Sequence, residues 1–172
     1  MKIVLISIKP KWCELITIGK KTIEVRKTKP RIDAPFKCYI YCTKEKAIGD
    51  FILCKSKELS DLFGLNAVIG INKGFAKEDD LQLKGKVIGE FMCNDITRFY
   101  PMMDFDKLNI NYKHIVDKSC VNMAGLSKYA NGKVLYAWCI SELKIYDKPK
   151  ELSEFGIKRP PQSWCYVEEV QE

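Results

Sequence analysis

The first 26 residues have the clearest pattern in the chain, and they limit the fold more than any other segment. Residues 2–8 are rich in Ile and Val and predict a strand. Pro10 suits the first turn of a helix, where its missing N–H costs nothing, and Gly19 suits the residue after a helix. Residues 22–26 alternate polar and apolar side chains, which predicts a second strand. Two strands around a short helix favour a mixed sheet with short helices at its periphery.

The rest of the chain adds more strands, joined by long connections. Three further segments have strand composition: residues 37–43, 86–99 and 133–146. Gly89 interrupts the second of these and indicates a bulge or a close backbone approach. Pro149 is expected to end the third. The sequence therefore predicts an α+β fold, a small mixed barrel with peripheral short helices, rather than a parallel βαβ fold.

The connections are less regular than the strands. Residues 122–129 and 151–155 predict short helices, and residues 100–120 are expected to form a loop. Tandem prolines predict an extended segment over 159–166. Residues 44–84 are poorly patterned, apart from a possible short helix near residues 60–65. They are expected to form a long excursion from the sheet.

Length and hydrophobicity indicate the organisation of the chain. Its 172 residues fit one domain, so we expect a single domain over residues 1–172. No apolar run approaches the roughly 18 residues that a membrane span needs, and no signal-peptide core precedes a cleavage site. We therefore expect a cytoplasmic protein without membrane contact.

The cysteines point to the same compartment. There are eight, none in a Cys-x-x-Cys pair, and His114 is the single histidine. Structural zinc sites use closely spaced ligand pairs, so we expect no metal and no cofactor. Most of the cysteines lie among apolar residues and are expected to be buried thiols in a reducing cytoplasm.

The net charge of +7 is concentrated at one end of the chain. Residues 1–46 hold twelve Lys and Arg residues but only four Asp and Glu, whereas residues 47–172 are close to neutral. Local charge determines field strength, so this cluster suits a phosphate-binding face. A solvated lysine-rich surface is the equally weighted alternative.

Residues 19–26, Gly-Lys-Lys-Thr-Ile-Glu-Val-Arg, carry the most informative polar pattern. Alternation places Thr22, Glu24 and Arg26 on one face of a strand, at intervals of about 7 Å. Lys20 and Lys21 come just before this strand, and Lys9 ends the first strand. A cluster of Lys, Arg and Glu side chains around a turn can bind an anion and form hydrogen bonds with the polar edge of a ligand. The alternative is an exposed strand on which these side chains form only ion pairs with a neighbouring strand.

Aromatic and amide side chains are candidates to complete a binding site. Trp12 lies in the predicted first helix, and base stacking on such a ring is worth about 1–3 kcal/mol. Trp138 and Trp164 are further candidates, and for each of the three tryptophans a place in the core is the more common alternative. Gln162 and Ser163 follow two prolines, and this rigid segment either presents an amide to a base or serves as a structural strap.

These motifs together resemble the ASCH domain family. The main match is Gly-x-Lys-Thr-x-Glu-x-Arg, preceded by Ser-Ile-Lys-Pro and followed by the strand motif Gly-Lys-Val-Ile-Gly-Glu. Distal segments look like the subgroup found in bacterial and prophage genomes: residues 136–140, 145–149, 152–155 and 160–164. The resemblance implies a PUA-like barrel, a cleft between the first helix and the barrel, and RNA or nucleotide binding.

Some members of that family are small amidohydrolases that act on acylated cytidine. Lys21 matches their catalytic lysine, Glu24 stands where they have a threonine, and Glu90 is one candidate for their distal glutamate. If the chain is an enzyme, Lys21 and Glu24 are the expected catalytic residues.

Three functions thus remain open from the sequence. RNA or nucleotide binding leads. A hydrolase acting on a modified nucleoside and a non-catalytic protein-interaction module are the alternatives. The sequence does not fix the oligomeric state.

Overall fold

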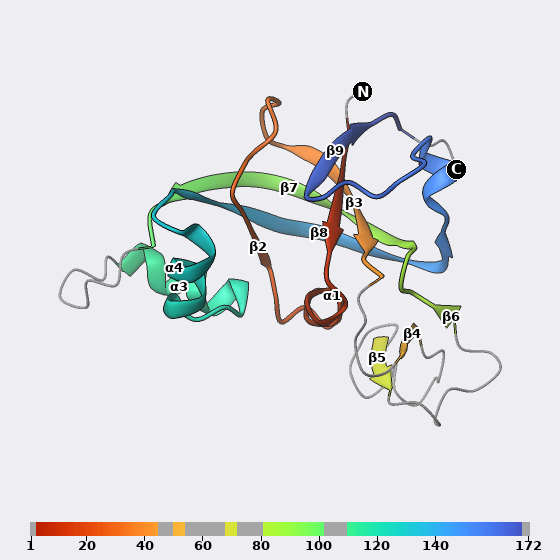
Figure 1. The fold of residues 1–172 in the computed structure, drawn as a ribbon, viewed down its shortest axis with the longest axis horizontal. Coiled ribbons are helices and arrows are strands. Elements are labelled where there is room, and N and C mark those ends of the chain that lie inside the picture. Colours follow the sequence, from red (N-terminus) through yellow and green to blue (C-terminus); the bar gives the residue numbers. More distant parts are fainter. Residues whose placement is uncertain (1–2, 45–49, 54–67, 72–80, 102–109, 170–172) are drawn as a thin grey trace.

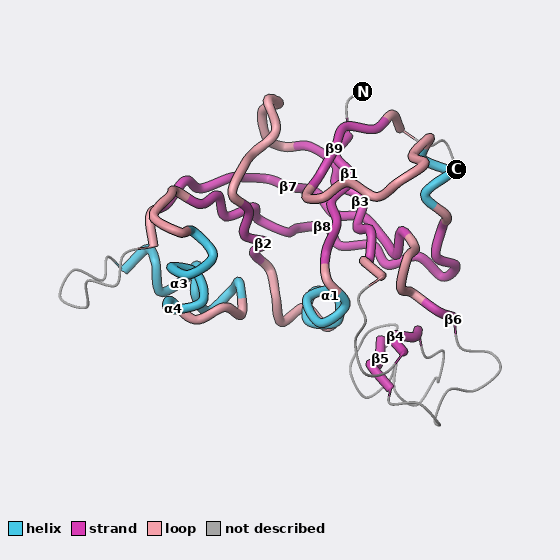
Figure 2. The backbone as a smooth tube through the Cα atoms, in the orientation of Figure 1, coloured by secondary structure: helices cyan, strands magenta, loops and turns pink. Residues whose placement is uncertain are grey.

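The computed structural model of the chain describes residues 3–44, 50–53, 68–71, 81–101 and 110–169. Its main feature is a six-stranded mixed sheet (Figures 1 and 2). The strands follow the order β2-β8-β7-β3-β1-β9; β1 and β3 run parallel, and the other neighbours are antiparallel. Their bounds are β1 Ile3–Ile8, β2 Ile23–Arg26, β3 Phe36–Cys42, β7 Val87–Phe99, β8 Leu135–Lys150 and β9 Trp164–Val167.

Alternation along β1 and β3 divides the core between the two faces of the sheet. Val4 and Ile6 face one cluster with Cys38 and Ile40, while Leu5 faces another. Tyr39 and Tyr41 of β3 belong to the second cluster with Phe155, as the period of two predicts. Because both faces of β1 are covered, all six of its residues are buried.

The long strands β7 and β8 form one continuous ribbon (Figure 1). The predicted close approach at Gly89 is confirmed, because a Cβ there would run into the backbone oxygen of Lys144 in β8. The prediction that Pro149 ends the strand was wrong by one residue. β8 continues to Lys150, which pairs with Val87.

Within the described ranges, four short helices lie around the sheet: α1 Pro10–Thr17, α3 Ile110–Ser119, α4 Met123–Ala130 and the 3₁₀ helix η2 Leu152–Phe155. The positions of α1, α4 and η2 follow the sequence predictions. Residues 110–119 were expected within a loop, and this prediction was wrong. Ile115 and Val116 give only a narrow apolar stripe, and α3 packs that stripe onto a cluster that contains Phe99.

Residues 50–82 contain a second sheet of three strands. These are β4 Asp50–Leu53, β5 Val68–Ile71 and β6 Leu81–Gln82, in the order β5-β4-β6. The helix expected near residues 60–65 lies outside the described residues. The single domain over 1–172, with its excursion at about 44–84, stays a prediction.

The predicted α+β class with peripheral short helices is confirmed. Strands β2 and β9 are the edges of the main sheet. Arg26 of β2 nevertheless reaches Ser7 in β1, the neighbour of β9. A side chain therefore connects the two ends of the curved sheet. No helix within the described ranges is long and apolar enough to cross a membrane.

Candidate functional site

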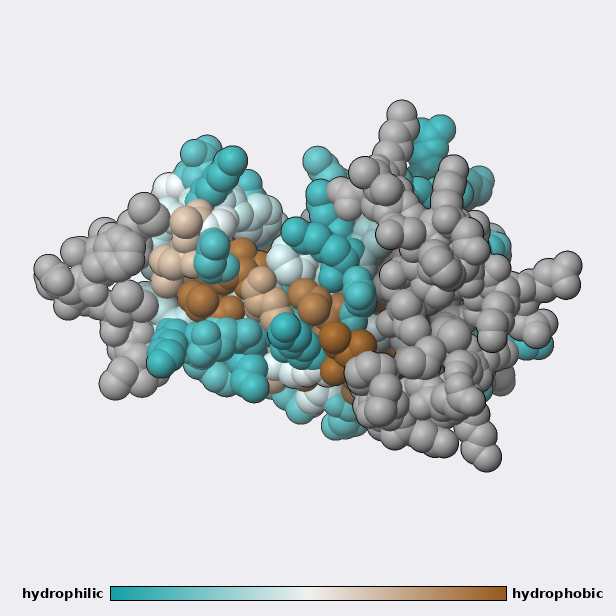
Figure 3. Space-filling view, turned by 90° about the horizontal axis from the view of Figure 1, so that it is seen from below, coloured by the Kyte–Doolittle hydropathy of each residue, from teal (hydrophilic) through white to brown (hydrophobic). Residues whose placement is uncertain are grey.

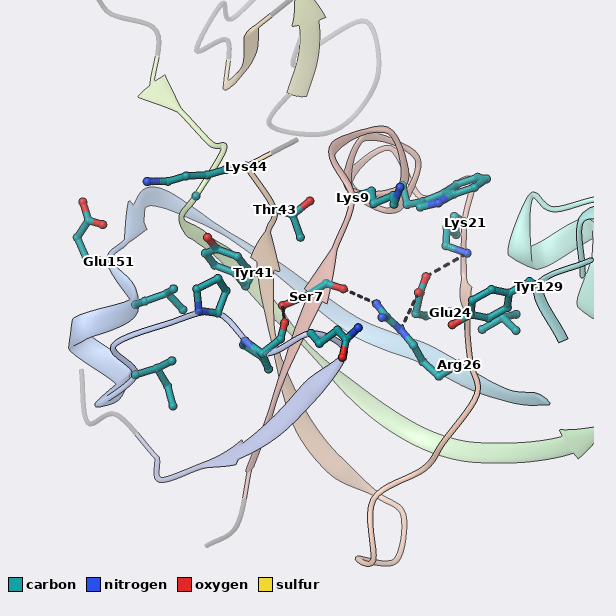
Figure 4. Close-up of a pocket in the computed structure, with 18 of the residues that line it drawn as sticks. Ser7, Lys9, Lys21, Glu24, Arg26, Tyr41, Thr43, Lys44, Tyr129 and Glu151 are labelled. Atoms are coloured by element: carbon teal, nitrogen blue, oxygen red, sulfur yellow. Dashed lines mark hydrogen bonds and ion pairs between the residues drawn. The ribbon is translucent and has the colours of Figure 1, made fainter. Parts of the chain in front are cut away.

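A cleft of about 1350 Å³ opens beside the point where the two ends of the sheet meet. Its walls come from the start of α1, from β2 and α4, from the end of β3, and from the segment 151–162 (Figure 4). Among the described residues, the cationic side chains that line it are Lys9, Lys21, Arg26, Lys44 and Lys158. The carboxylates of the described lining are Glu24 and Glu151. The lining is therefore positive on balance, as the charge of the first 46 residues predicts.

A buried network of three charged side chains lies within this cleft. Glu24 Oε2 is 3.2 Å from Lys21 Nζ, and Glu24 Oε1 is 3.0 Å from Arg26 Nε. The three side chains are at most 10% exposed. Both carboxylate oxygens of Glu24 thus face cations. This pairing offsets the free-energy cost of removing each charge from water.

Lys21 is held by the backbone as well as by Glu24. Its Nζ donates to the carbonyl oxygens of Ile23 and Ser119, each at 2.8 Å. With Glu24, these acceptors match the three N–H donors of an ammonium group. Since Ser119 ends α3, Lys21 also joins that helix to β2.

Arg26 keeps hydrogen-bonding capacity for a ligand. Its Nη2 donates to the Ser7 carbonyl at 2.5 Å, and its Nη1 is 3.5 Å from Ser163 Oγ. A guanidinium carries five N–H donors. Within the described part of the chain, these bonds use one N–H on each Nη atom, and Nε faces Glu24 as an ion pair without hydrogen-bond geometry.

Local sequence explains why these side chains converge. Gly19 takes a φ of +70° after α1, which turns the chain so that the Lys21 amide donates to Leu15. Ile23 and Val25 pack on the apolar cluster beside α3 and α4, so the alternate residues of β2 face the cleft. The sequence predicts this shared face. It does not predict its burial, since α4 and the segment 151–162 cover it from distant positions.

Two aromatic rings flank the network. Trp12 of α1 lies 5.2 Å from Lys21 Nζ and 4.2 Å from Lys11 Nζ, measured from the ring centroid. Tyr129 of α4 is 40% exposed, and Lys27 Nζ lies over its ring, 4.9 Å from the ring centroid. Burial raises the pKa of the Tyr129 phenol, so its hydroxyl stays protonated at neutral pH. Figure 3 shows apolar surface between hydrophilic borders on the face that carries α1, α3 and α4.

Of the other tryptophans, Trp138 belongs to the core and Trp164 is partly buried against it. Trp138 is fully buried, and its ring centroid lies 6.1 Å from that of Trp164. Trp164 in turn donates from Nε1 to Thr28 Oγ1 at 3.0 Å. This arrangement ties the segment after β2 to β9.

The structure brings together only part of the predicted set. Lys9, Trp12, Lys21, Arg26 and Gln162 line the cleft with Glu24. Lys20 is exposed and is not among the lining residues. Ser163 acts as a strap residue, because its carbonyl accepts from the Ser7 amide at 2.9 Å.

Glu90 lies in a different polar cluster. It accepts from the Tyr146 hydroxyl at 2.6 Å and lies 3.8 Å from Lys37 Nζ, and it does not line the cleft. His114 on α3 is exposed and also does not line it. Among the described residues, no group of three or more His, Cys, Asp or Glu side chains is arranged to hold a metal ion.

Several lining residues were not singled out from the sequence. Tyr41, Thr43, Lys44 and Lys158 line the end of the cleft near η2, and Tyr129 lines the end near α4. These residues have no shared local motif. Only the positions of Thr43 and Lys44, at the end of the strand predicted over residues 37–43, offered a signal.

The fold and cleft define a small α+β protein with a mixed sheet and a positively lined cleft. No family model and no curated protein matches the chain. It is similar to the solved ASCH protein of Zymomonas mobilis, with 16% identity and a TM-score of 0.61 over 96% of this chain and 87% of that chain. Two mutants of that protein, also 16% identical, give TM-scores of 0.63 and 0.62. The match with a TM-score of 0.63 covers 99% of this chain and 93% of that mutant. The match with a TM-score of 0.62 covers 98% of this chain and 89% of that mutant.

The chain thus has the ASCH fold that its motifs predicted. The bacterial and prophage subgroup stays a prediction.

Proposed function

We propose that the chain binds RNA, or a nucleotide derived from it, in the cleft. The observation that supports this most is the pairing of Glu24 with both Lys21 and Arg26. That pairing neutralises the carboxylate in the centre of the site, and it leaves a cleft lined with further cations. Phosphate groups are recognised by such cations and bases by flanking aromatic rings.

The geometry supports a different role for each residue. Lys9 and Arg26 contact phosphate or a polar base edge, since Lys9 is exposed at the cleft and Arg26 has donors left. Trp12 and Tyr129 stack on bases. Glu24 and Lys21 hold Arg26 in place. Gln162, which lines the cleft, offers its amide to a base edge.

The hydrolase alternative needs a neutral lysine as nucleophile or base. Lys21 instead faces three acceptors, one of them a carboxylate, and three acceptors match an ammonium group. The geometry therefore favours binding over amide hydrolysis. The seven cysteines within the described ranges are free thiols, which supports our further proposal of a reducing cytoplasmic compartment.

The test is binding of a fluorescent single-stranded RNA, measured by anisotropy between 0.05 and 0.5 M salt. Lys9→Ala removes one expected phosphate contact, so the slope of log affinity against log salt becomes shallower by about 0.7. Lys148→Ala, at an exposed position outside the cleft, is the matched control and keeps the wild-type slope. Equal affinity and slope for the wild type and Lys9→Ala would overturn the proposal.

Two further measurements separate the alternatives. Turnover of N4-acylated cytidine that disappears in Lys21→Met would establish the hydrolase. Capture of a protein partner that survives nuclease treatment, without RNA binding by the purified chain, would establish the interaction module.

A further inference from the structure

We infer that the end of the cleft near η2 is a second phosphate subsite, so that the cleft holds a single-stranded oligonucleotide rather than one nucleotide. This inference rests on the proposed function. It assigns ligand contacts to Tyr41, Thr43, Lys44 and Lys158, which line the cleft outside the Lys21–Glu24–Arg26 network and come from the end of β3 and from the residues after η2.

The size and shape of the cleft first suggest a longer ligand. Pockets for a single small molecule measure about 300–1,000 Å³, whereas this cleft is about 1350 Å³. Figure 4 shows Lys21, Glu24, Arg26 and Tyr129 at one end and Tyr41, Lys44 and Glu151 at the other, with Thr43 nearer the middle. Ser7 lies between the two groups.

The charge at the η2 end is positive once its carboxylate is accounted for. Glu151 forms an ion pair with Lys86, and its side chain also accepts from the Glu154 amide in a capping box. The cations that line this end are Lys44 and Lys158. A second anion is therefore attracted to a place separated from Arg26.

Backbone structure fixes the residues of the second subsite. Gly85, with a φ of +82°, donates its amide to the Cys42 carbonyl at 2.7 Å. A Cβ at Gly85 would overlap the Lys44 side chain, so glycine allows the Lys44 stem to lie across the turn. The Thr43 amide donates to Ile8 at 2.9 Å, which holds the end of β3 against β1.

Neutral donors accompany the two lysines. Burial raises the pKa of the Tyr41 phenol, and the Glu151 charge adds to this rise, so the hydroxyl remains an O–H donor at neutral pH. Thr43 contributes a second hydroxyl beside it. Hydroxyl and ammonium donors are the usual partners of phosphate oxygens.

The floor between the two ends is rigid. Ser7 Oγ donates to the Pro161 carbonyl at 2.7 Å, and the Ser7 amide donates to Ser163 at 2.9 Å. These bonds hold the segment 161–163 across β1. The spacing between the two ends is consequently set by the fold, which suits a ligand with regularly spaced phosphates.

The experiment compares a nucleoside 5′-monophosphate with a six-nucleotide single-stranded RNA, both as competitors of a fluorescent RNA. The test variant is Lys44→Ala with Lys158→Ala. The control is Lys133→Ala with Lys148→Ala, which removes two exposed lysines outside the cleft. Thermal unfolding confirms that each variant is folded.

We expect the test variant to bind the hexanucleotide about tenfold more weakly at 0.1 M salt, with a salt slope shallower by about 1.4 for two lost phosphate contacts. Its affinity for the monophosphate, which contacts fewer of the lining cations, should fall clearly less than its affinity for the hexanucleotide. The inference would be overturned if the test variant bound the hexanucleotide as tightly as the wild type does, or if the binding of both ligands were weakened equally. It would also be overturned if an acidic peptide of the same charge competed as well as the hexanucleotide does.

A wild-type protein that binds neither nucleic-acid ligand would instead overturn the proposed function. The two failures are therefore distinguishable.

Discussion

Arg26 Nη2 donates to the backbone carbonyl of Ser7 across 2.5 Å, and this bond links β2 to β1 although the two strands are not neighbours in the sheet. The same guanidinium pairs with Glu24 and approaches Ser163. One side chain thus positions a cleft residue and connects the two ends of the sheet. Its planar fork of donors makes this combination possible.

The first prediction concerns Arg26→Lys. A lysine keeps the positive charge near Glu24, but its single ammonium group does not span Glu24, Ser7 and Ser163 together. We expect a loss of about 2 kcal/mol in the free energy of unfolding, the scale of a hydrogen bond to a charged group. Urea denaturation measures it. Arg98→Lys, at an exposed position of β7, is the control, and an equal effect of the two changes would contradict the prediction.

The second prediction concerns the buried pair of Lys21 and Glu24. Lys21→Met and Glu24→Gln each leave a buried charge with fewer partners, so each is expected to lower stability by about 3 kcal/mol. The double variant removes both charges, and its loss should be smaller than the sum of the single losses by about 1–3 kcal/mol. A denaturant-based double-mutant cycle measures this coupling. Strict additivity would show that the ion pair does not contribute.

The third prediction tests the approach of β7 to β8. Gly89→Ala places a Cβ against the Lys144 backbone oxygen, which has no flexible atoms to move aside. We expect a destabilisation of about 2 kcal/mol from this overpacking. Asn94→Ala, at an exposed position of the same strand, controls for strand propensity. Wild-type thermal stability of Gly89→Ala would rule out the close approach.

The fourth prediction concerns the cap of α4, the helix that carries Tyr129. Asn122 Oδ1 accepts from the Gly125 amide at 2.8 Å. Asn122→Ala should therefore lower stability by about 1 kcal/mol, whereas Asn122→Ser retains a capping oxygen and should stay within a few tenths of wild type. Chemical denaturation followed by circular dichroism distinguishes them. Equal losses for both variants would argue against a capping role.

The fifth prediction concerns thiol reactivity at pH 8. Burial raises the pKa of Cys93 to about 12, and it raises the pKa values of Cys13 and Cys38 well above the ordinary thiol value. A raised pKa lowers the thiolate fraction, and the thiolate is the reactive form. These three thiols should stay unmodified by iodoacetamide in the native protein, as peptide mass spectrometry reports. All eight cysteines should react in guanidinium chloride, and rapid native labelling of Cys38 would contradict the burial.

Local rules predicted the elements that depend on local chemistry. Pro10 is the first residue of α1, and Gly19 follows the end of that helix with a positive φ. Gly89 lies where the backbones of β7 and β8 approach too closely for a Cβ. The alternation in residues 22–26 placed Glu24 and Arg26 on one face. These features follow from dihedral preferences and from the period of a strand, both of which a single sequence contains.

The remaining features depend on contacts between distant segments. Helix α3 is stabilised by packing against a cluster that contains Phe99, so its own weak pattern predicted a loop. The burial of Lys21 depends on Ser119, and the η2 end of the cleft joins Lys44 to Lys158. No local period encodes which segment will cover a given face, so these parts of the site were missed.

The bonds from Ser7 to Pro161 and Ser163 also make the cleft depend on segments that are translated at different times. β1 is translated well before β9, so the pairing of the two strands waits for residues 164–167. Such sequence-distant pairing is slow to form. A nascent chain therefore carries the basic motif of residues 19–26 before the segment 161–163 and β9 can complete the walls of the cleft.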